Sequence, residues 1–279
     1  MLAPGVTLLA ALHDPEGRIG ALLPGQLPAV LRHFAHVAVI CRPDTAIETQ
    51  NGVRDAGAEL IFDPDLPINP RPTMLRLAAA RTESAWAYVH LGDLDSALHW
   101  ANRHPAELDE ANATLRDHDF TVFGRTARAN ATLPPAQRTT EAVINAMFAA
   151  VTGGVEHWWI GPEPHATPDI CTGAWGFSRR GLEVLAARAT ATDIGFHAEW
   201  PLLARDTPGL RCAYLPTNGM EYETADRYGP EIAAAGGLDG WIAAGERDVN
   251  RWRFRLAYVR QVADFLAAYT AVRGAVAGQ

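Results

Sequence analysis

The first half of the chain alternates short apolar runs with longer amphipathic segments. Apolar runs of strand length lie at 6–11, 36–41, 59–62 and 85–91. Segments long enough for helices lie between them, at 26–33, 45–56 and 73–81. This order predicts strand–helix units around a mainly parallel sheet, so we expect an α/β fold with helices flanking a central sheet. In such open sheets, ligands bind beyond the carboxyl ends of the strands.

The second half is less regular. Further strands are expected at 120–123 and 210–215, and helices at 140–151, 178–187, 197–205 and 248–272. Ser178 is a suitable N-cap for the second of these helices, and His157, Trp158 and Trp159 are expected in the core. No Pro- or Gly-rich linker separates the two halves, so one compact unit with a helical C-terminal extension is predicted.

The amino-acid composition excludes several classes of reaction and ligand. The 279 residues carry 32 acidic and 24 basic side chains, a net charge of -8, and every basic residue is arginine. Mechanisms built on a lysine amine are therefore excluded, and the acidic balance argues against a nucleic-acid binder. Cys41, Cys171 and Cys212 are far apart, which suggests neither a disulfide framework nor a zinc knuckle and favours a reducing cytoplasm.

The sharpest local signal is Asp93-Leu94-Asp95, directly after the apolar run 85–91. Two carboxylates one residue apart at a strand end can converge on one hard divalent cation, which would offset the charge of a diphosphate. The alternative is a polar turn or helix cap, which an isolated Asp-x-Asp often forms. Three strand–helix units before the motif favour the metal site.

In this context the chain resembles the GT-A class of nucleotide-sugar glycosyltransferases, similar to glycosyltransferase family 2. The resemblance covers about residues 5–225 and rests on the strand order, on the segment 88–95 at the place of the family's Asp-x-Asp motif, and on the segment 172–180. It implies a GT-A-like, Rossmann-like catalytic domain over 1–228, with a nucleotide-sugar-binding half (1–95) and an acceptor half (96–228). Residues 229–279 would form the helical extension.

The resemblance implies the donor contacts and the cofactor. Asp93 and Asp95 would hold Mn2+ or Mg2+ against the donor diphosphate, and the ends of the first three strands would bind the nucleoside. The residues at the strand ends are His13, Asp14, Asp44 and Asp63. Arg71 and Arg76 stand where the family has a basic donor contact. Ser96 replaces a frequent third aspartate, and the usual motifs of the helix before the fourth strand are degraded.

The acceptor side offers several candidates. Glu199, beside Trp200, is the candidate general base for an inverting reaction, because partial burial raises a carboxyl pKa; a helix N-terminal glutamate is the alternative. Trp175 could lie against a sugar face, with Gly173 allowing close approach, or it could be a core aromatic. Glu221 and Glu223 could complete the metal shell or bind acceptor hydroxyls, or lie in a solvated loop.

Other polar residues have competing interpretations. His197 could be a metal ligand, although a satisfied core histidine is the commoner case. Arg125, Arg128 and Arg138 could grip an anionic acceptor by bidentate hydrogen bonds or form surface ion pairs. The arginines of the segment 248–272 are expected on a solvated face, with contact to an anionic membrane surface as the weaker reading.

The sequence therefore predicts a metal-dependent glycosyltransferase that moves a sugar from a nucleotide-diphosphate sugar to a hydroxyl of a small-molecule, glycan or lipid acceptor. The alternatives are a sugar nucleotidylyltransferase and an inactive sugar-nucleotide-binding protein. The absence of a glycine-rich loop and of a lysine after the first strand counts against the nucleotidylyltransferase. A cytoplasmic location is expected, with peripheral membrane contact left open as an alternative, and no apolar run is long enough to cross a bilayer. Donor sugar, acceptor, stereochemistry and homodimer formation are left open.

Overall fold

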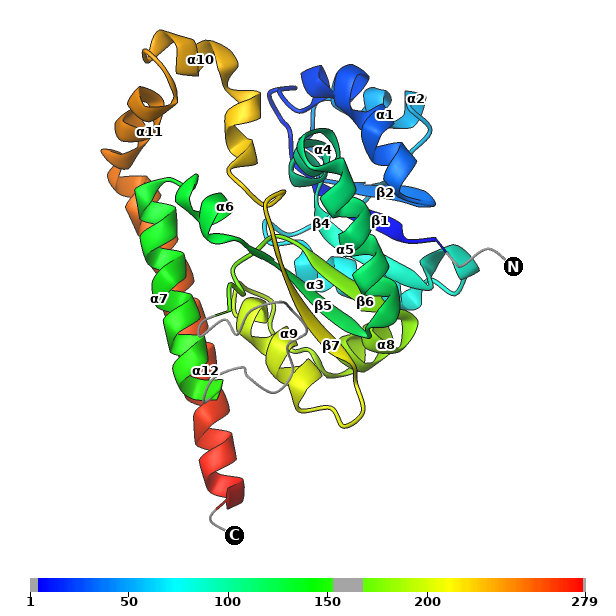
Figure 1. Cartoon of the computed structure of the whole chain (residues 1–279), viewed down its shortest axis with the longest axis vertical. Coiled ribbons are helices and arrows are strands. Elements are labelled where there is room, and N and C mark those ends of the chain that lie inside the picture. Colours follow the sequence, from blue (N-terminus) through cyan, green and yellow to red (C-terminus); the bar gives the residue numbers. More distant parts are fainter. Residues whose placement is uncertain (1–4, 153–167, 278–279) are drawn as a thin grey trace.

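A seven-stranded sheet forms the centre of the molecule in the computed structural model, which describes residues 5–152 and 168–277 (Figure 1). The strands are β1 (Thr7–Leu12), β2 (His36–Cys41), β3 (Glu59–Phe62), β4 (Tyr88–Asp93), β5 (Phe120–Arg125), β6 (Trp175–Ser178) and β7 (Cys212–Thr217). Their order is β3-β2-β1-β4-β6-β5-β7. The mixed, mostly parallel α/β sheet predicted from the sequence is confirmed.

The first four strands run parallel, so their carboxyl ends meet at one edge of the sheet. Ala11 of β1 is paired with Asp93 of β4, and Leu12 of β1 with Cys41 of β2. Every residue of β1 is buried, as expected for a parallel strand covered on both faces. This register brings the polar residues after β1, β2 and β4 to neighbouring positions.

Helices cover both faces of the sheet because successive side chains of a strand point to opposite sides. On one face, Leu8 and Ala10 pack with residues of the helices α1 (Leu23–His33) and α4 (Leu94–Arg103). On the other, Leu9 and Ala11 pack with residues of α3 (Arg71–Ala80) and α8 (Arg179–Arg188). The helices and 3₁₀ turns (η) of the first half are η1 (Gly20–Leu22), α1 (Leu23–His33), α2 (Ile47–Asp55), α3 (Arg71–Ala80), η2 (Ser84–Trp86), α4 (Leu94–Arg103), α5 (Pro105–Asp117), α6 (Ala127–Ala131) and α7 (Pro135–Thr152). The second half contributes α8 (Arg179–Arg188), α9 (Phe196–Arg205), η3 (Glu223–Arg227), α10 (Gly229–Ala234), α11 (Leu238–Glu246) and α12 (Val249–Ala277).

Strand β6 breaks the parallel pattern. It runs antiparallel between β4 and β5, with Leu91 paired to Trp175 and Phe120 paired to Phe177. The apolar pattern did not predict this strand, because Trp175–Ser178 contains only two apolar side chains around a glycine. As a result, the residues that precede β6 lie beside the carboxyl end of β4.

The C-terminal helix α12 lies against the second half of the molecule. The long helix α12 runs along α7 and also packs on α9 (Figure 1). Val262 and Leu266 of α12 are buried in the core on one face of the sheet. Within the predicted extension, α12 is therefore packed onto the domain, whereas α10 and α11 bury none of their residues.

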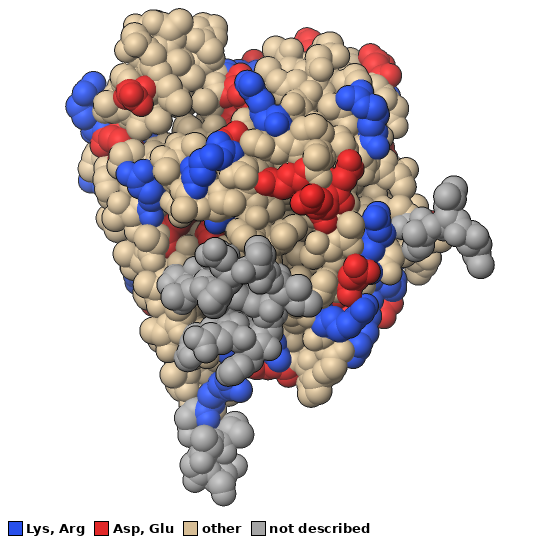
Figure 2. All heavy atoms as spheres, in the orientation of Figure 1, with Lys and Arg blue, Asp and Glu red and all other residues tan. Residues whose placement is uncertain are grey.

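Surface charge and helix length bear on the expected partners. In the described part of the face shown in Figure 2, arginine and acidic side chains are interspersed and form no continuous basic surface. None of the described helices combines the length and apolarity that crossing a membrane requires. The predicted core segment His157–Trp159 lies outside the described residues.

Candidate active site

Three carboxylates gather at the carboxyl end of β4. Asp93 ends the strand, Asp95 lies in the first turn of α4, and Glu223 opens the turn η3 that follows β7. Arg71, at the start of α3, donates a hydrogen bond to Asp93. Arg227 forms an ion pair with Asp95, with Nη1 and Oδ2 3.2 Å apart. Each aspartate of the predicted motif thus faces an arginine from another element.

The electrostatics of this cluster favour a cation. Burial and the neighbouring Asp95 carboxylate raise the pKa of Glu223 to about 7. Burial also raises the pKa of Asp95, with Asp93 acting in the same direction and Arg227 in the opposite one. The two arginines therefore do not offset the combined effect of burial and of the neighbouring carboxylates on these pKa values. Carboxylate oxygens are the ligands that Mg2+ and Mn2+ prefer, but those of Asp93, Asp95 and Glu223 do not all lie within 4.8 Å of one another in the described structure.

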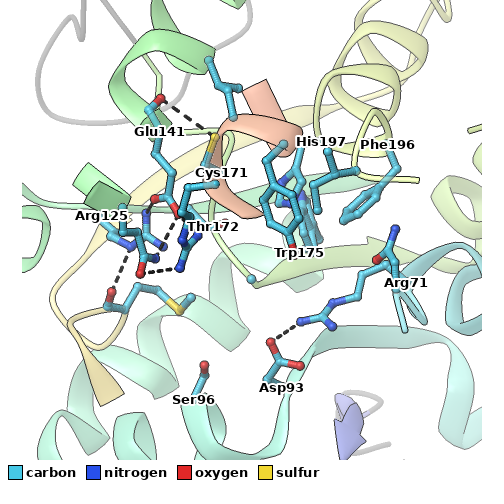
Figure 3. Close-up of a pocket in the computed structure, with 18 of the residues that line it drawn as sticks. Arg71, Asp93, Ser96, Arg125, Glu141, Cys171, Thr172, Trp175, Phe196 and His197 are labelled. Atoms are coloured by element: carbon cyan, nitrogen blue, oxygen red, sulfur yellow. Dashed lines mark hydrogen bonds and ion pairs between the residues drawn. The ribbon is translucent and has the colours of Figure 1, made fainter. Parts of the chain in front are cut away.

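A cavity of about 240 Å³ opens beside these carboxylates (Figure 3). Arg71 and Asp93 face each other on one side, and Arg125 lies near Glu141 on another. The remaining walls come from the segment before β6, from α9, from the loop after β7 and from α12. Among the lining residues are Asn69, Ser96, Thr172, Gly173, Trp175, His197, Tyr222, Glu223, Arg255 and Tyr258.

Gly173 brings the backbone close to the acidic cluster. A Cβ atom at this position would lie 3.4 Å from Oδ2 of Asp93 and 3.7 Å from Nη2 of Arg71. A larger side chain would fill the space in front of both groups. The predicted role of Gly173, close approach at the substrate side, is compatible with this position.

His197 presents one ring nitrogen to the cavity wall. Its Nδ1 lies 2.7 Å from the carbonyl oxygen of Ile170, which can only accept, so Nδ1 carries the proton. Burial lowers the pKa of His197 to about 3, so the ring is neutral and Nε2 has a free lone pair. The side chain can therefore accept a hydrogen bond from a substrate hydroxyl, but it is a weak base.

Trp175 lines the same cavity and is also part of the core. Its ring is fully buried and packs edge-on against Phe196 and Trp200, with ring centroids 5.3 Å apart in both pairs. The core interpretation of the sequence therefore applies, and the ring also lines the cavity; contact of Trp175 with a sugar face stays a prediction.

A buried ion network forms the wall near α7. Arg125 donates through Nη1 to Glu141 (2.7 Å) and Asp169 (3.0 Å), and through Nε to the carbonyl oxygen of Met220 (3.1 Å). Arg255 of α12 donates to Glu141 (3.2 Å) and to the side chain of Gln137 (2.7 Å). Arg125 is thus engaged by protein carboxylates. Arg255 lines the cavity, so the expectation that it lies on a solvated face is wrong.

A second cavity, also about 240 Å³, lies at the end of β1. It is lined by His13, Asp14, Pro15, Glu16, Arg18, Arg227 and Tyr228. Asp14 is buried, and its oxygens accept hydrogen bonds from the backbone of Arg18 and Gly20 and from the Thr49 hydroxyl. Asp14 therefore shapes the turn after β1 and has little capacity left for a ligand.

The other predicted donor contacts are scattered at the same edge. His13 and Asp44 are exposed and interact with each other, with Nε2 and Oδ2 3.1 Å apart. Asp63 accepts from the backbone of Asp65 after β3, and Arg76 is exposed on α3. Asp63 and Arg76 line neither of these two cavities. The structure thus brings Arg71, Asp93, Asp95 and Glu223 together and leaves these residues apart.

Glu199 is turned away from both cavities. Its carboxylate accepts hydrogen bonds from the backbone of Thr190 and Ala191 and from the Thr190 hydroxyl, at 2.7–3.2 Å. This arrangement fixes the loop before α9. The role of Glu199 as general base stays a prediction, and its placement does not favour it.

Glu221 and two of the predicted anion-binding arginines also lie outside the first cavity. Glu221 contacts His99, His104 and Arg128. Arg138 is exposed and donates to the carbonyl oxygen of Ala131. These residues form local networks.

Comparison with known proteins identifies the architecture. No protein-family model matches the chain, and no curated protein sequence is significantly similar to it. The structure is similar to glucosyl-3-phosphoglycerate synthase from Mycobacterium tuberculosis in complex with UDP, with a TM-score of 0.56, 16% identity, and coverage of 96% of this chain and 81% of that one. The chain has the GT-A glycosyltransferase fold.

Two further structures of the same enzyme support this fold. The complex with Mn2+, UDP and phosphoglyceric acid has a TM-score of 0.52 at 17% identity, covering 77% of this chain and 69% of that one. The complex with Mn2+, UDP and glucosyl-3-phosphoglycerate has a TM-score of 0.51 at 17% identity, covering 84% and 78%. The GT-A resemblance seen in the sequence is thus confirmed for the fold, and membership of family 2 stays a prediction.

Several residues of the site could not be found from the sequence. Arg227, Tyr222, Arg255 and Tyr258 reach the two cavities from η3, the loop before it and α12. Each is a common residue type outside any motif. The one available signal is the run of acidic and aromatic residues over 218–228, from which only Glu221 and Glu223 are predicted as site residues.

Proposed function

We propose that this protein is a metal-dependent glycosyltransferase that transfers a sugar from a nucleotide-diphosphate sugar to an acceptor hydroxyl. The observation that carries the proposal is the position of Asp93 and Glu223 on the wall of a cavity at the carboxyl end of β4, with Asp95 near enough to raise the pKa of Glu223. The GT-A fold supports it, because ligands of open α/β sheets bind at this edge. The Mn2+ and UDP in the neighbouring structures are in line with it.

The residues of the acidic cluster would hold the cofactor. Asp93 and Asp95, with Glu223 as a third ligand, would bind Mn2+ or Mg2+, which acts as a Lewis acid and neutralises charge on a leaving diphosphate. Arg71 is placed to contact a phosphate oxygen once Asp93 turns to the metal, since its guanidinium lies at the same cavity wall. Arg227, which pairs with Asp95, would likewise contact a phosphate oxygen once Asp95 turns to the metal.

The two cavities suggest where donor and acceptor lie. The cavity at the end of β1 includes His13 and borders Asp44, so we assign the nucleoside to it. The cavity bounded by Gly173, Trp175 and His197 would hold the sugar and the acceptor. In this arrangement Nε2 of His197 orients a hydroxyl by accepting its hydrogen bond. Because its neighbours bind UDP and phosphoglyceric acid, UDP-sugars and small phosphorylated hydroxy acids are the first substrates to test.

Metal-dependent turnover tests the proposal. Purified protein is incubated with UDP-, GDP- and dTDP-sugars, with and without Mn2+, and release of the nucleoside diphosphate is measured. We expect turnover with at least one donor, abolished by chelation and lowered about 100-fold or more by Asp95→Asn, because the metal contributes several kcal/mol to the transition state. Asp264→Asn, an exposed acid on α12, is the matched control.

Three outcomes would count against the proposal. Full metal-dependent turnover by Asp95→Asn would show that the acidic cluster does not hold the catalytic metal. Release of pyrophosphate from a nucleoside triphosphate and a sugar 1-phosphate would identify a sugar nucleotidylyltransferase instead. Binding of sugar nucleotide with no turnover of any donor would indicate a binding protein.

Three further expectations about the whole chain remain part of the proposal. These are the division at residue 228, a cytoplasmic protein with peripheral membrane contact through the arginines of α12, and the choice between a monomer and a homodimer. Co-sedimentation with vesicles containing anionic lipid tests the membrane contact, and light scattering of the purified chain gives its oligomeric state.

A further inference from the structure

Two histidines and a glutamate converge at the corner between α4 and α5. His99 lies on α4, His104 joins α4 to α5, and Glu221 comes from the loop after β7. Oε1 of Glu221 lies 3.0 Å from Nε2 of His99 and 3.0 Å from Nε2 of His104. One potential ligand atom of each residue lies within 4.8 Å of the other two.

Groups around the cluster fix the orientation of the potential ligands. Asp226 lies 2.6 Å from Nδ1 of His99 and Glu221 lies 3.0 Å from Nε2, so each nitrogen donates a hydrogen bond to a carboxylate. A metal at Nε2 would replace its proton and leave Nδ1–H bonded to Asp226. Arg128 donates to Oε2 of Glu221 at 2.7 Å and leaves Oε1 facing the two rings. A carboxylate behind a histidine, and a donor behind a carboxylate, are the outer partners typical of protein metal ligands.

Ligand chemistry and spacing indicate the class of cation. Ligands held tetrahedrally at about 2.0–2.1 Å lie about 3.3 Å apart, close to the distances of 3.0 Å in this cluster. Two imidazoles with one carboxylate suit Zn2+ and similar transition metals, whereas Mg2+ prefers oxygen ligands alone. Glu221 and Asp226 supply two negative charges that balance a divalent cation.

We propose that His99, His104 and Glu221 bind one Zn2+-class ion, separate from the acidic cluster at Asp93 and Asp95. A fourth position is open to water on the side of His104, whose side chain is 24% exposed. Arg128 contacts His104 at 3.5 Å and, with 54% of its side chain exposed, can move aside. The site does not depend on the proposed sugar transfer.

The consequence of this site is the position of the loop after β7. Glu221 ties that loop to α4 and α5, and Tyr222 and Glu223 in the same loop line the first cavity. A metal at Glu221 would therefore hold Glu223 in place beside Asp95. His99, His104 and Glu221 are positioning residues in this arrangement, because their side chains do not line that cavity.

The test measures metal binding directly. Protein without a polyhistidine tag is stripped with a chelator and titrated with Zn2+ by calorimetry in excess Mg2+, which occupies the acidic cluster. We expect one equivalent of Zn2+ to bind tightly, His104→Gln to weaken binding at least tenfold, and Asp226→Asn to weaken it about 10–100-fold. The control is His36→Gln, which removes a histidine that pairs with a single glutamate, Glu59.

Co2+ gives a second measurement that needs no variant. Bound to the stripped wild-type chain in the same excess of Mg2+, Co2+ with nitrogen ligands in four-coordinate geometry gives intense visible bands, which we expect here. Weak bands of a six-coordinate ion, no Zn2+ binding, or equal Zn2+ binding by a folded His104→Gln would overturn the proposal. The cluster would then be an ion-pair network bridged by a protonated His99. A failure of sugar transfer would leave these binding results unchanged.

Discussion

Substitution of Arg125 can distinguish a structural role of this side chain from a role in binding a ligand. Its side chain is 6% exposed, and those of its partners Glu141 and Asp169 are 10% and 7% exposed. Replacing Arg125 with methionine keeps much of the volume but leaves two buried carboxylates facing each other. Removing one partner of a buried ion pair costs about 3–5 kcal/mol. Arg255 still contacts Glu141, so we expect a loss of stability near the lower end of that range.

Urea denaturation at several pH values measures this effect. The loss for Arg125→Met should be largest at neutral pH and shrink in acid, because protonation of the two carboxylates in the folded variant removes their repulsion. Adding Glu141→Gln to Arg125→Met should restore part of the stability. Arg138→Met, at an exposed position on α7, is the matched control and should change stability by about 0.5 kcal/mol or less.

The opposite result would refute this reasoning. If Arg125→Met unfolds at the same urea concentration as the wild type at neutral pH, the network contributes no net stability. If activity also fell, with KM for an anionic acceptor raised and kcat unchanged, Arg125 would contact the acceptor, as one interpretation of the sequence holds.

Three further predictions concern Glu223, Gly173 and Gly181. Because the pKa of Glu223 is raised to about 7, the metal-free chain should lose stability as pH rises from about 4.5 to 7. Glu223→Gln should lack this loss when both proteins are unfolded with urea across that pH range. Parallel curves of stability against pH for the wild type and the variant would contradict the prediction. Gly173→Val should lower turnover at least tenfold and leave the melting temperature unchanged, because the valine side chain would crowd Asp93 and Arg71. If the melting temperature fell together with turnover, Gly173 would have a packing role instead. Gly181→Ala should destabilise the fold by about 1–3 kcal/mol in thermal denaturation, because the alanine Cβ would clash with the carbonyl oxygen of Asp119. Helix propensity alone would make this variant more stable than the wild type, and that result would contradict the geometry.

The parallel half of the fold was predictable because its signals are local. Strands β2 and β3 match the predicted ranges, and each helix of the first half that was predicted is present within a few residues. Buried parallel strands are continuous apolar runs, and turn residues mark their ends. The position of Asp93 follows directly, since it is the last residue of such a strand.

The rest of the site depends on long-range packing. The ion pair of Asp95 with Arg227 joins residues 132 positions apart in the sequence, and no local pattern specifies such a contact. Glu199 illustrates the same limit, because its position at the start of a helix was predicted but the direction of its carboxylate is set by the loop 190–191. Helix α12 was predicted as a helix, and only its packing against α7 brings Arg255 to the cavity.

The reversed direction of β6 has a consequence for how substrate selectivity can change. In a parallel strand, the loop that reaches the ligand edge is the one that follows the strand; for β6 it is the one that precedes it, which carries Thr172 and Gly173. Residues after β6 enter α8 at the opposite edge. If the proposed function holds, insertions and substitutions ahead of this strand would therefore change acceptor choice while the strands of the sheet keep their register.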